Sequence, residues 1–191
     1  MKSPNYFLIK PKADKRYNNT VDLAGIEVLV SNSIEDGLKT NREGVVVETP
    51  IGYNGDVKKG DTIIVHHNTF RLMRNQRGEM VNSMKHIKDN LFYTDDYYLR
   101  IDKNEVKSSR FPYVFMKPII VDDELLGTIE HQNIGEVVFD NPKLNEIGIK
   151  NGNRYTFKDF RNVVFEIDGE KYFRMKYKDL LTEIWLVLEE I

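Results

Sequence analysis

One turn and the strand after it occur twice in this chain of 191 residues. The first copy is Val57-Lys58-Lys59-Gly60-Asp61-Thr62-Ile63-Ile64-Val65, and the second is Ile149-Lys150-Asn151-Gly152-Asn153-Arg154-Tyr155-Thr156-Phe157, at an offset of 92. Each copy places glycine and a short polar residue before a run of β-branched and aromatic residues, which predicts a tight turn that leads into a strand. A turn that recurs together with its strand indicates that a larger unit is repeated.

Two further blocks repeat in the same order along the chain. Tyr6-Phe7-Leu8-Ile9-Lys10-Pro11 corresponds to Tyr113-Val114-Phe115-Met116-Lys117-Pro118 at an offset of 107, and Gly44-Val45-Val46-Val47 corresponds to Gly135-Glu136-Val137-Val138 at an offset of 91. The smaller second offset means that the second copy lacks 16 residues between these blocks. We therefore predict a tandem duplication, with one domain over residues 1–109 and another over residues 110–191.

Short apolar runs separated by glycine and asparagine predict an all-β fold made of small barrels or sandwiches. Asp168-Gly169 lies between two such runs and predicts a two-residue hairpin turn, since a type I′ turn requires positive φ at both central residues. Three segments are assigned differently. Met80, Val81, Met84, Ile87 and Leu91 have the spacing of a short helix, residues 178–181 predict a helical turn, and residues 182–188 predict a closing strand, with an amphipathic helix as the alternative there.

Composition excludes several functions. The chain has 28 basic and 30 acidic residues, so its net charge of -2 offers no general attraction to nucleic acid. The absence of cysteine excludes disulfides, thiol nucleophiles and cysteine-ligated metal sites, and it fits a reducing compartment such as the cytoplasm. The first residues lack an apolar signal segment, and no apolar run is long enough to cross a bilayer, so we expect no membrane association.

Each repeat unit resembles the GroES-like co-chaperonins, which are small β-barrels that cap a chaperonin ring. The second unit carries the family's ordered motifs: Lys117-Pro118 at the end of the opening strand, a strand from Gly135, a Val-Lys-x-Gly-Asp-type turn with Asn153 in place of aspartate, and a closing hairpin at Ile167-Asp168-Gly169-Glu170. The first unit keeps Lys10-Pro11 and an intact Val57–Asp61 turn, but residues 71–90 replace its closing hairpin. The resemblance implies two tandem GroES-like barrels, the first with a long mobile loop.

The resemblance also implies where a partner binds. The family uses a mobile loop between its first two strands, which corresponds here to the polar residues 12–42. That segment contains one apolar island, which is similar to the family's Gly-Ile-Val-Leu anchor although Glu27 interrupts it. The expected chaperonin-binding residues are Gly25, Ile26, Val28, Leu29 and Val30. An alternative is that this island is simply a seventh strand, with its neighbours as ordinary loops.

In the second unit the same interval is short, and we expect residues 119–134 to form a tight structural loop, with a residual anchor at residues 125–129 as the alternative. The family forms rings through its first and last strands. The resemblance therefore implies a homo-oligomeric ring in which the subunit interface includes Tyr6, Leu8, Ile184, Leu186 and Leu188.

The remaining polar clusters favour structural roles. Adjacent strand residues point to opposite faces, so His66 and His67 are not expected to bind one metal ion, and His86 and His131 lie far away in the sequence. Acidic clusters at residues 95–96 and 122–124 are most simply solvated loops. Tyr93, Tyr97 and Tyr98 lack the basic stripe of a base-stacking platform, and Trp185 fits a core or interface anchor.

The resulting hypothesis is a co-chaperonin that caps a GroEL-type chaperonin and assists ATP-dependent folding, with no catalytic site, metal or cofactor of its own. Its asparagine-, lysine- and tyrosine-rich composition suggests a phage or organelle variant, and in a phage the site of action is the host cytoplasm. The alternative is a GroES-like barrel reused as a structural or assembly module, for example in a virion, without chaperonin binding. A third possibility is an enzyme whose site the sequence does not reveal.

Overall fold

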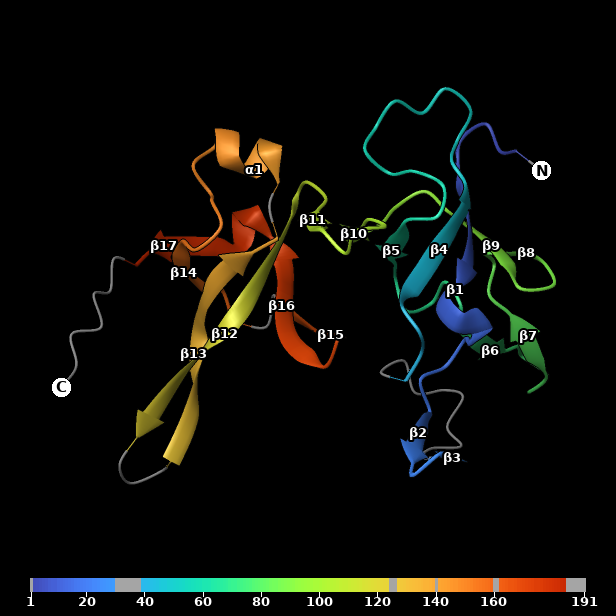
Figure 1. The fold of residues 1–191 in the computed structure, drawn as a ribbon, viewed down its shortest axis with the longest axis horizontal. Coiled ribbons are helices and arrows are strands. Elements are labelled where there is room, and N and C mark those ends of the chain that lie inside the picture. Colours follow the sequence, from blue (N-terminus) through green and yellow to red (C-terminus); the bar gives the residue numbers. More distant parts are fainter. Residues whose placement is uncertain (1, 30–38, 124–126, 140, 160–161, 185–191) are drawn as a thin grey trace. The chain divides into compact units, whose positions relative to one another are not determined.

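The chain folds into two compact β-rich units, Met1–Val106 and Lys107–Ile191 (Figure 1). The structure is a computed structural model that describes all residues except 1, 30–38, 124–126, 140, 160–161 and 185–191. Helix is confined to single turns in the described residues. The all-β class predicted from the sequence is therefore confirmed.

The first unit is built on six antiparallel strands in the order β10-β5-β4-β1-β9-β8. Their bounds are β1 (Phe7–Pro11), β4 (Glu43–Glu48), β5 (Thr62–Ile64), β8 (His86–Lys88), β9 (Leu91–Thr94) and β10 (Leu99–Ile101). Two hairpins stand outside this sheet, one formed by β2 (Thr20–Leu23) and β3 (Ile26–Leu29), the other by β6 (Leu72–Arg74) and β7 (Met80–Asn82). A 3₁₀ turn, η1 (Lys12–Asp14), ends β1.

The second unit has six antiparallel strands in the order β17-β14-β13-β12-β16-β15. Their bounds are β12 (Tyr113–Asp123), β13 (Gly127–Val138), β14 (Arg154–Phe157), β15 (Val163–Ile167), β16 (Glu170–Lys176) and β17 (Leu180–Glu183). The short strand β11 (Lys107–Ser109) precedes them, and single turns form α1 (Pro142–Glu146) and η2 (Tyr177–Asp179). Helix α1 begins at Asn141, whose side chain accepts from the backbone N–H groups of Lys143 and Leu144.

Most strand pairs have the same register in the two units, although each unit has a bulge that the other lacks, between Leu8 and Ile9 in β1 and between Tyr155 and Phe157 in β14. In the first unit Ile9 pairs with Val46 and Phe92, and Gly44 pairs with Pro11 and Ile63. The equivalent pairs in the second unit are Met116 with Val137 and Phe173, and Gly135 with Pro118 and Tyr155. The repeat blocks of the sequence, with offsets of 107, 91 and 92, contain all of these residues except Phe92 and Phe173. The six-strand pattern is therefore repeated with largely the same register.

The turns before β5 and β14 also share their hydrogen bonds. The Asp61 carboxylate accepts from the Lys58 N–H at 2.8 Å, and the Asn153 side-chain oxygen accepts from the Lys150 N–H at 3.0 Å. Gly60 and Gly152, the preceding residues, have φ of 92° and 84°, which glycine adopts without strain. Asn153 thus fulfils the same turn role as Asp61 without its charge.

Each unit has its own hydrophobic core, and equivalent positions differ in size. Phe7 and Ile63 in the first core correspond to Val114 and Tyr155 in the second, so one large side chain is lost where another is gained. Such compensation keeps the core volume roughly constant, which interiors tolerate best. Leu144 of α1 adds to the second core.

Gly44 and Gly135 pair with the first strand of each unit, and side chains of that strand approach them too closely for a larger residue. A Cβ atom on Gly44 would lie 2.9 Å from Cδ1 of Ile9, and one on Gly135 would lie 3.0 Å from Cβ of Met116 and 3.1 Å from the carbonyl oxygen of Lys117. Glycine at this position in both copies thus leaves room for the side chains of the neighbouring strand, β1 or β12.

Several finer predictions have different outcomes. In the described residues neither six-stranded sheet closes into a barrel. The hairpin at Asp168-Gly169 is confirmed, with φ of 53° and 77°. The helical turn at residues 178–181 is a 3₁₀ turn displaced to Tyr177–Asp179, and the closing strand begins at Leu180 and is described to Glu183.

Two predictions were wrong. Residues 80–91 hold strands β7, β8 and the start of β9 instead of a short helix. The described residues of the range 119–134 do not form a tight loop, because β12 continues to Asp123 and β13 begins at Gly127, and the two strands are paired there (Figure 1).

Candidate protein-binding surface

The apolar island predicted to bind a partner lies on the β2–β3 hairpin of the first unit. Leu23 pairs with Ile26 across a two-residue turn, in which Ala24 and Gly25 have φ of 56° and 84°. Positive φ at both positions matches the twist of a type I′ hairpin. The island therefore forms a strand, as in the alternative, but the preceding residues form its partner strand instead of a loop, and in the described residues the hairpin is hydrogen-bonded to no third strand.

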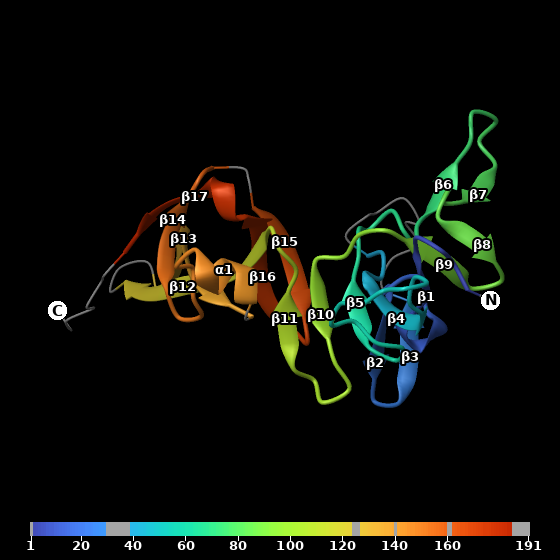
Figure 2. The same cartoon turned by 90° about the horizontal axis from the view of Figure 1, so that it is seen from above.

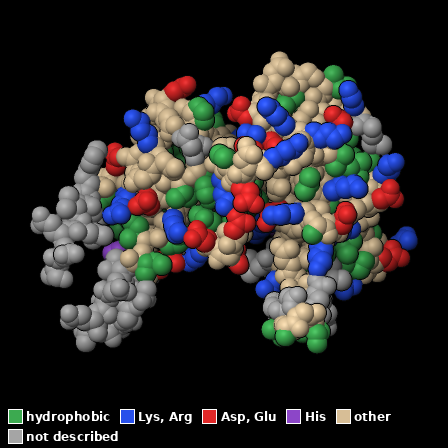
Figure 3. Space-filling view, in the orientation of Figure 1, with side chains coloured by type: hydrophobic (Ala, Val, Ile, Leu, Met, Phe, Trp, Pro, Cys, Tyr) green, Lys and Arg blue, Asp and Glu red, His purple; other side chains and the backbone are tan. Residues whose placement is uncertain are grey.

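One face of this hairpin is apolar and exposed. Leu23 lies directly opposite Ile26, and Val28 is two residues further along the same strand, so the three share a face. Their side chains are 59%, 67% and 39% exposed. Figure 3 shows hydrophobic side chains at the lower tip of the first unit. Isolated two-stranded hairpins are only marginally stable in water, and exposed apolar patches commonly mark interaction sites.

An ordered neck carries the hairpin. Tyr17 and Thr40 form an isolated bridge, and the N–H of Asn18 donates to the carbonyl of Lys39 at 2.7 Å. Asn41, almost fully buried, donates its side-chain amide to the carbonyls of Lys12 and Lys15.

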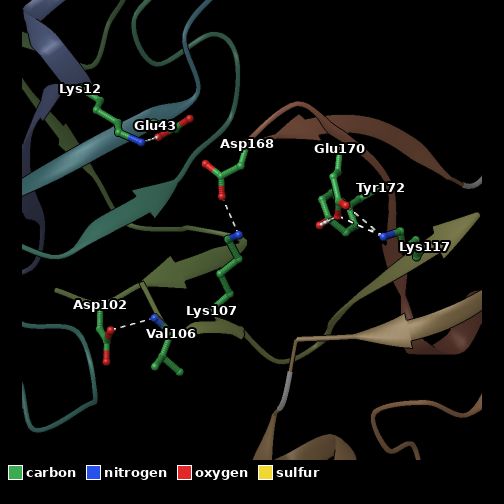
Figure 4. A network of polar contacts seen from close by, with 9 residues as sticks. All are labelled: Lys12, Glu43, Asp102, Val106, Lys107, Lys117, Asp168, Glu170 and Tyr172. Carbon is green, nitrogen blue, oxygen red and sulfur yellow. Dashed lines mark hydrogen bonds and ion pairs between the residues drawn. The ribbon is translucent and has the colours of Figure 1, made fainter. Parts of the chain in front are cut away.

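An ion pair closes the neck beside the main sheet. Lys12, at the end of β1, pairs with Glu43, the first residue of β4 (Figure 4). These contacts hold together the two points at which the chain leaves the sheet after β1 and returns to it at β4.

Arg16 and Tyr17 tie this neck to the root of the β6–β7 hairpin. Arg16 donates Nε to the carbonyl of Phe70 and Nη1 to Oδ1 of Asn82, both at 2.7 Å, and its guanidinium lies over the Phe92 ring at 5.0 Å. The Tyr17 hydroxyl accepts from the N–H of Leu72 at 2.7 Å. Burial lowers the pKa of Arg16, although the group stays charged because its ordinary value is so high. We call this pair the Arg16–Tyr17 latch.

The second unit has no separate hairpin at the equivalent place in its described residues. There β12 and β13 continue past a bulge between Pro118 and Ile120, and Asn133 has a φ of 62°. Ile120 is 63% exposed. Lys171 braces this ribbon through an ion pair to Glu130 at 2.6 Å.

A charged network holds the start of the same ribbon (Figure 4). Glu170 accepts from the Tyr172 hydroxyl at 2.6 Å and from the Lys117 ammonium at 3.1 Å. The bond from Tyr172 and then that from Lys117 lower the pKa of Glu170. Burial and this carboxylate raise the pKa of Tyr172. The first strands of the two units therefore end differently, in a neck or in a braced ribbon.

The predicted binding residues fall into two groups. Gly25, Ile26, Val28 and the backbone of Leu29 lie in the β2–β3 hairpin, and Val30 lies outside the described residues. Leu23 was missed by sequence reasoning, although its position just before Ala24-Gly25, opposite an apolar run, is a hairpin signal. The Arg16–Tyr17 latch was also missed, because its bonds span more than 50 residues.

The predicted subunit interface needs correction at one residue. Leu8 is only 3% exposed, and β1 is bonded to β4 on one side and β9 on the other, so Leu8 offers neither a surface nor a free strand edge. Tyr6 is 38% exposed and packs on Tyr93. Ile184 is half-buried just after β17, an end strand of its sheet, and Leu186 and Leu188 lie outside the described residues.

The histidine pair is arranged differently from the prediction. His66 and His67 enter the turn after β5, so their rings stack at 4.1 Å instead of pointing to opposite faces. Burial, and then the neighbouring His66, Arg42 and Arg71, lower the pKa of His67 to about 4. No group of three or more potential metal ligands occurs in the part of the chain that is described. Trp185 lies outside it.

No family model matches this chain, and no curated protein matches it either. Among the described residues there is no helix of the length and apolar character needed to span a membrane.

Proposed function

We propose that this chain is a co-chaperonin of the GroES type, which caps a GroEL-type chaperonin ring and assists ATP-dependent protein folding. The observation that carries the proposal is the exposed apolar face of Leu23, Ile26 and Val28. This face lies between the first and second strands of the repeat unit, where the resemblance places the family's partner-binding loop. The chain itself supplies no catalytic group, and the partner hydrolyses ATP.

The ordered neck supports this role. A hairpin that is fixed at its root and exposes Leu23, Ile26 and Val28 can present these apolar side chains to a groove on another protein. Three side chains of this size bury little area, so each contact is weak. A ring of subunits multiplies such contacts into useful avidity, which makes a homo-oligomer part of the proposal.

Ring formation is proposed through the ends of the chain. β17 is the last strand of its sheet, so its outer edge is the natural position for pairing with another subunit, and Tyr6 and Ile184 remain candidate interface residues. Closure of the two open sheets into GroES-like barrels belongs to the same proposal. We place the activity in the cytoplasm, or the host cytoplasm for a phage protein.

A binding and refolding assay tests the proposal. Purified GroEL-type chaperonin with ATP is mixed with the full chain or with Leu23→Ser/Ile26→Ser. Ile51→Ser is the matched control, because Ile51 is 63% exposed in the same unit but away from the hairpin. We expect wild type and the control to bind and support refolding, and the double variant to lose both activities.

Two results would overturn the proposal. If wild type neither binds nor supports refolding, the chain is not a co-chaperonin, and the alternative of a structural or assembly module takes its place. If the double variant works as well as wild type, the hairpin is not the binding element. Mass measurement of the wild type adds a check, since a strict monomer at micromolar concentration contradicts a ring.

A further inference from the structure

The β6–β7 hairpin is the second element of the first unit that stands outside the main sheet (Figure 2). Asn75 organises its tip: its side-chain oxygen accepts from the N–H groups of Arg77 at 2.9 Å and Glu79 at 3.0 Å, and its amide donates to the Glu79 carboxylate at 2.8 Å. Gly78 completes the turn with a φ of 79°. The tip is thus held by its own polar contacts and does not depend on a neighbouring element.

The β6–β7 hairpin exposes large apolar side chains. Met73 and Val81 lie opposite each other on one face and are 42% and 38% exposed. Met80 is 38% exposed on the other face, and Met84, just beyond the hairpin, is 89% exposed. Methionine adapts its shape to a partner surface and is common where proteins bind other proteins.

The same segment is strongly basic in an otherwise slightly acidic chain. Residues 71–88 contain five arginine and lysine residues, of which Lys85 forms an ion pair with Asp95 at 2.7 Å, and a single acid, Glu79, whose carboxylate is engaged in the turn. Arg77 and Lys88 are exposed. A surface of this composition is complementary to an apolar surface bordered by carboxylates.

We propose that the β6–β7 hairpin is a second docking site for the protein partner of the β2–β3 hairpin, binding an apolar patch of that partner bordered by Asp and Glu. This inference rests on the proposed function, since it takes the partner to be the chaperonin. The Arg16–Tyr17 latch ties the neck of the first hairpin to the root of the second, so both hairpins are anchored at neighbouring positions of the same unit.

The observations favour a protein over a lipid surface. Segments that lie in a membrane interface usually carry tryptophan or phenylalanine on their apolar side, and residues 72–88 contain no aromatic residue other than His86. A preformed hairpin with an internally bonded tip is instead suited to a shaped protein surface, because little conformational freedom is lost on binding.

Two variants test the two parts of the site. Met73→Ser/Val81→Ser removes the apolar face, and Arg77→Glu/Lys88→Glu reverses the charge. Lys150→Glu, an exposed lysine of the second unit, is the control for charge change. Dissociation constants for purified GroEL-type chaperonin with ATP are measured at low and high salt, and hydrogen exchange checks that each variant is folded.

We expect the apolar variant to bind about tenfold more weakly, about 1.4 kcal/mol, at both salt concentrations. The charge variant should lose a similar factor at low salt and less at high salt, because salt screens exposed charges. The control should bind as wild type does.

Three outcomes would contradict this expectation. If wild type binds, the β2–β3 variant does not, and both β6–β7 variants bind normally, the second site is overturned while the proposed function stands. If wild type itself does not bind, the proposed function fails and this inference fails with it. If wild type binds phosphatidylserine vesicles and the two variants do not, the hairpin is a membrane-binding element and the inference is overturned.

Discussion

The two units share one six-stranded pattern but differ in the connections between its strands. The first unit places separate hairpins after β1 and before β8, whereas the second continues β12 and β13 into a single ribbon. The β2–β3 hairpin and the β12–β13 ribbon both follow the repeated Lys-Pro sequence, at residues 10–11 and 117–118, whereas the β6–β7 hairpin follows β5. The sheet is therefore the constant part of the repeat, and the connections are where the two copies have acquired different surfaces.

The largest expected effect is a loss of stability when a buried ring is removed from one of the two cores. Phe92→Ala and Phe173→Ala remove equivalent buried rings, which pack on Phe70 and Phe157 respectively. Each variant should lose about 3–5 kcal/mol of unfolding free energy, because the cavity adds to the lost burial. Hydrogen exchange should show reduced protection confined to the unit that carries the substitution. Equal loss in both units would mean that they unfold as one.

The next largest loss of stability is expected at the repeated turn before β5. Asp61→Asn keeps the bond to the Lys58 N–H but removes the carboxylate that pairs with the largely buried Arg100 at 2.7 Å. We expect denaturant unfolding to show a loss of about 1.5–3 kcal/mol.

The reciprocal substitution, in the turn before β14, tests whether the two turns differ only in charge. Asn153 donates to the Glu183 carboxylate, so Asn153→Asp places two carboxylates together. This variant should be destabilised at neutral pH and should recover as the pH is lowered, since protonation of one acid removes the repulsion. Unchanged stability in both variants would show that the two turns are interchangeable.

A smaller effect is expected at the latch, which has no counterpart in the described part of the second unit. Tyr17→Phe leaves the N–H of Leu72 without its acceptor and should cost about 0.5–1.5 kcal/mol. Amide exchange in β6 and β7 should accelerate, while exchange in β12 and β13 stays the same. An unchanged exchange rate at Leu72 would argue that water replaces the hydroxyl without loss.

The smallest effect concerns pH. The pKa of His67 is lowered to about 4, so the folded state favours the neutral ring, and stability falls as the pH drops from about 6.5 toward 4. His67→Gln should flatten this part of the stability curve. The second unit has Lys158 and Asp159 at the equivalent positions, so acid should affect the first unit earlier. A curve as steep in the variant as in wild type would exclude this histidine as the cause.

The repeated blocks explain why so much of the sheet could be predicted. Strand register follows the alternation of side chains and the turn chemistry, and both are local properties of segments such as residues 57–65. The hairpin at Asp168-Gly169 was predictable for the same reason.

The elaborations could not be predicted in the same way. Met80, Met84 and Ile87 have helical spacing, but the segment is held as strands by the Asn75 turn and by the distant Arg16 and Tyr17 side chains. The candidate binding face was found from its apolar residues. Its neck was not, because the Tyr17–Thr40 bridge and the bonds of Asn41 join residues far apart in the chain.

The charges beside the two repeated turns differ in a way that disfavours an exchange of equivalent strands between the two units. Arg100 lies opposite Ile63 as Glu183 lies opposite Tyr155, so β10 and β17 fill the same position. A chain that exchanged these strands would set Glu183 beside Asp61, with two carboxylates at a nearly buried site, and would leave Arg100 beside an uncharged asparagine. The different charges at the two turns thus disfavour an exchange of β10 and β17, and such misassembly is the characteristic hazard of tandem repeats.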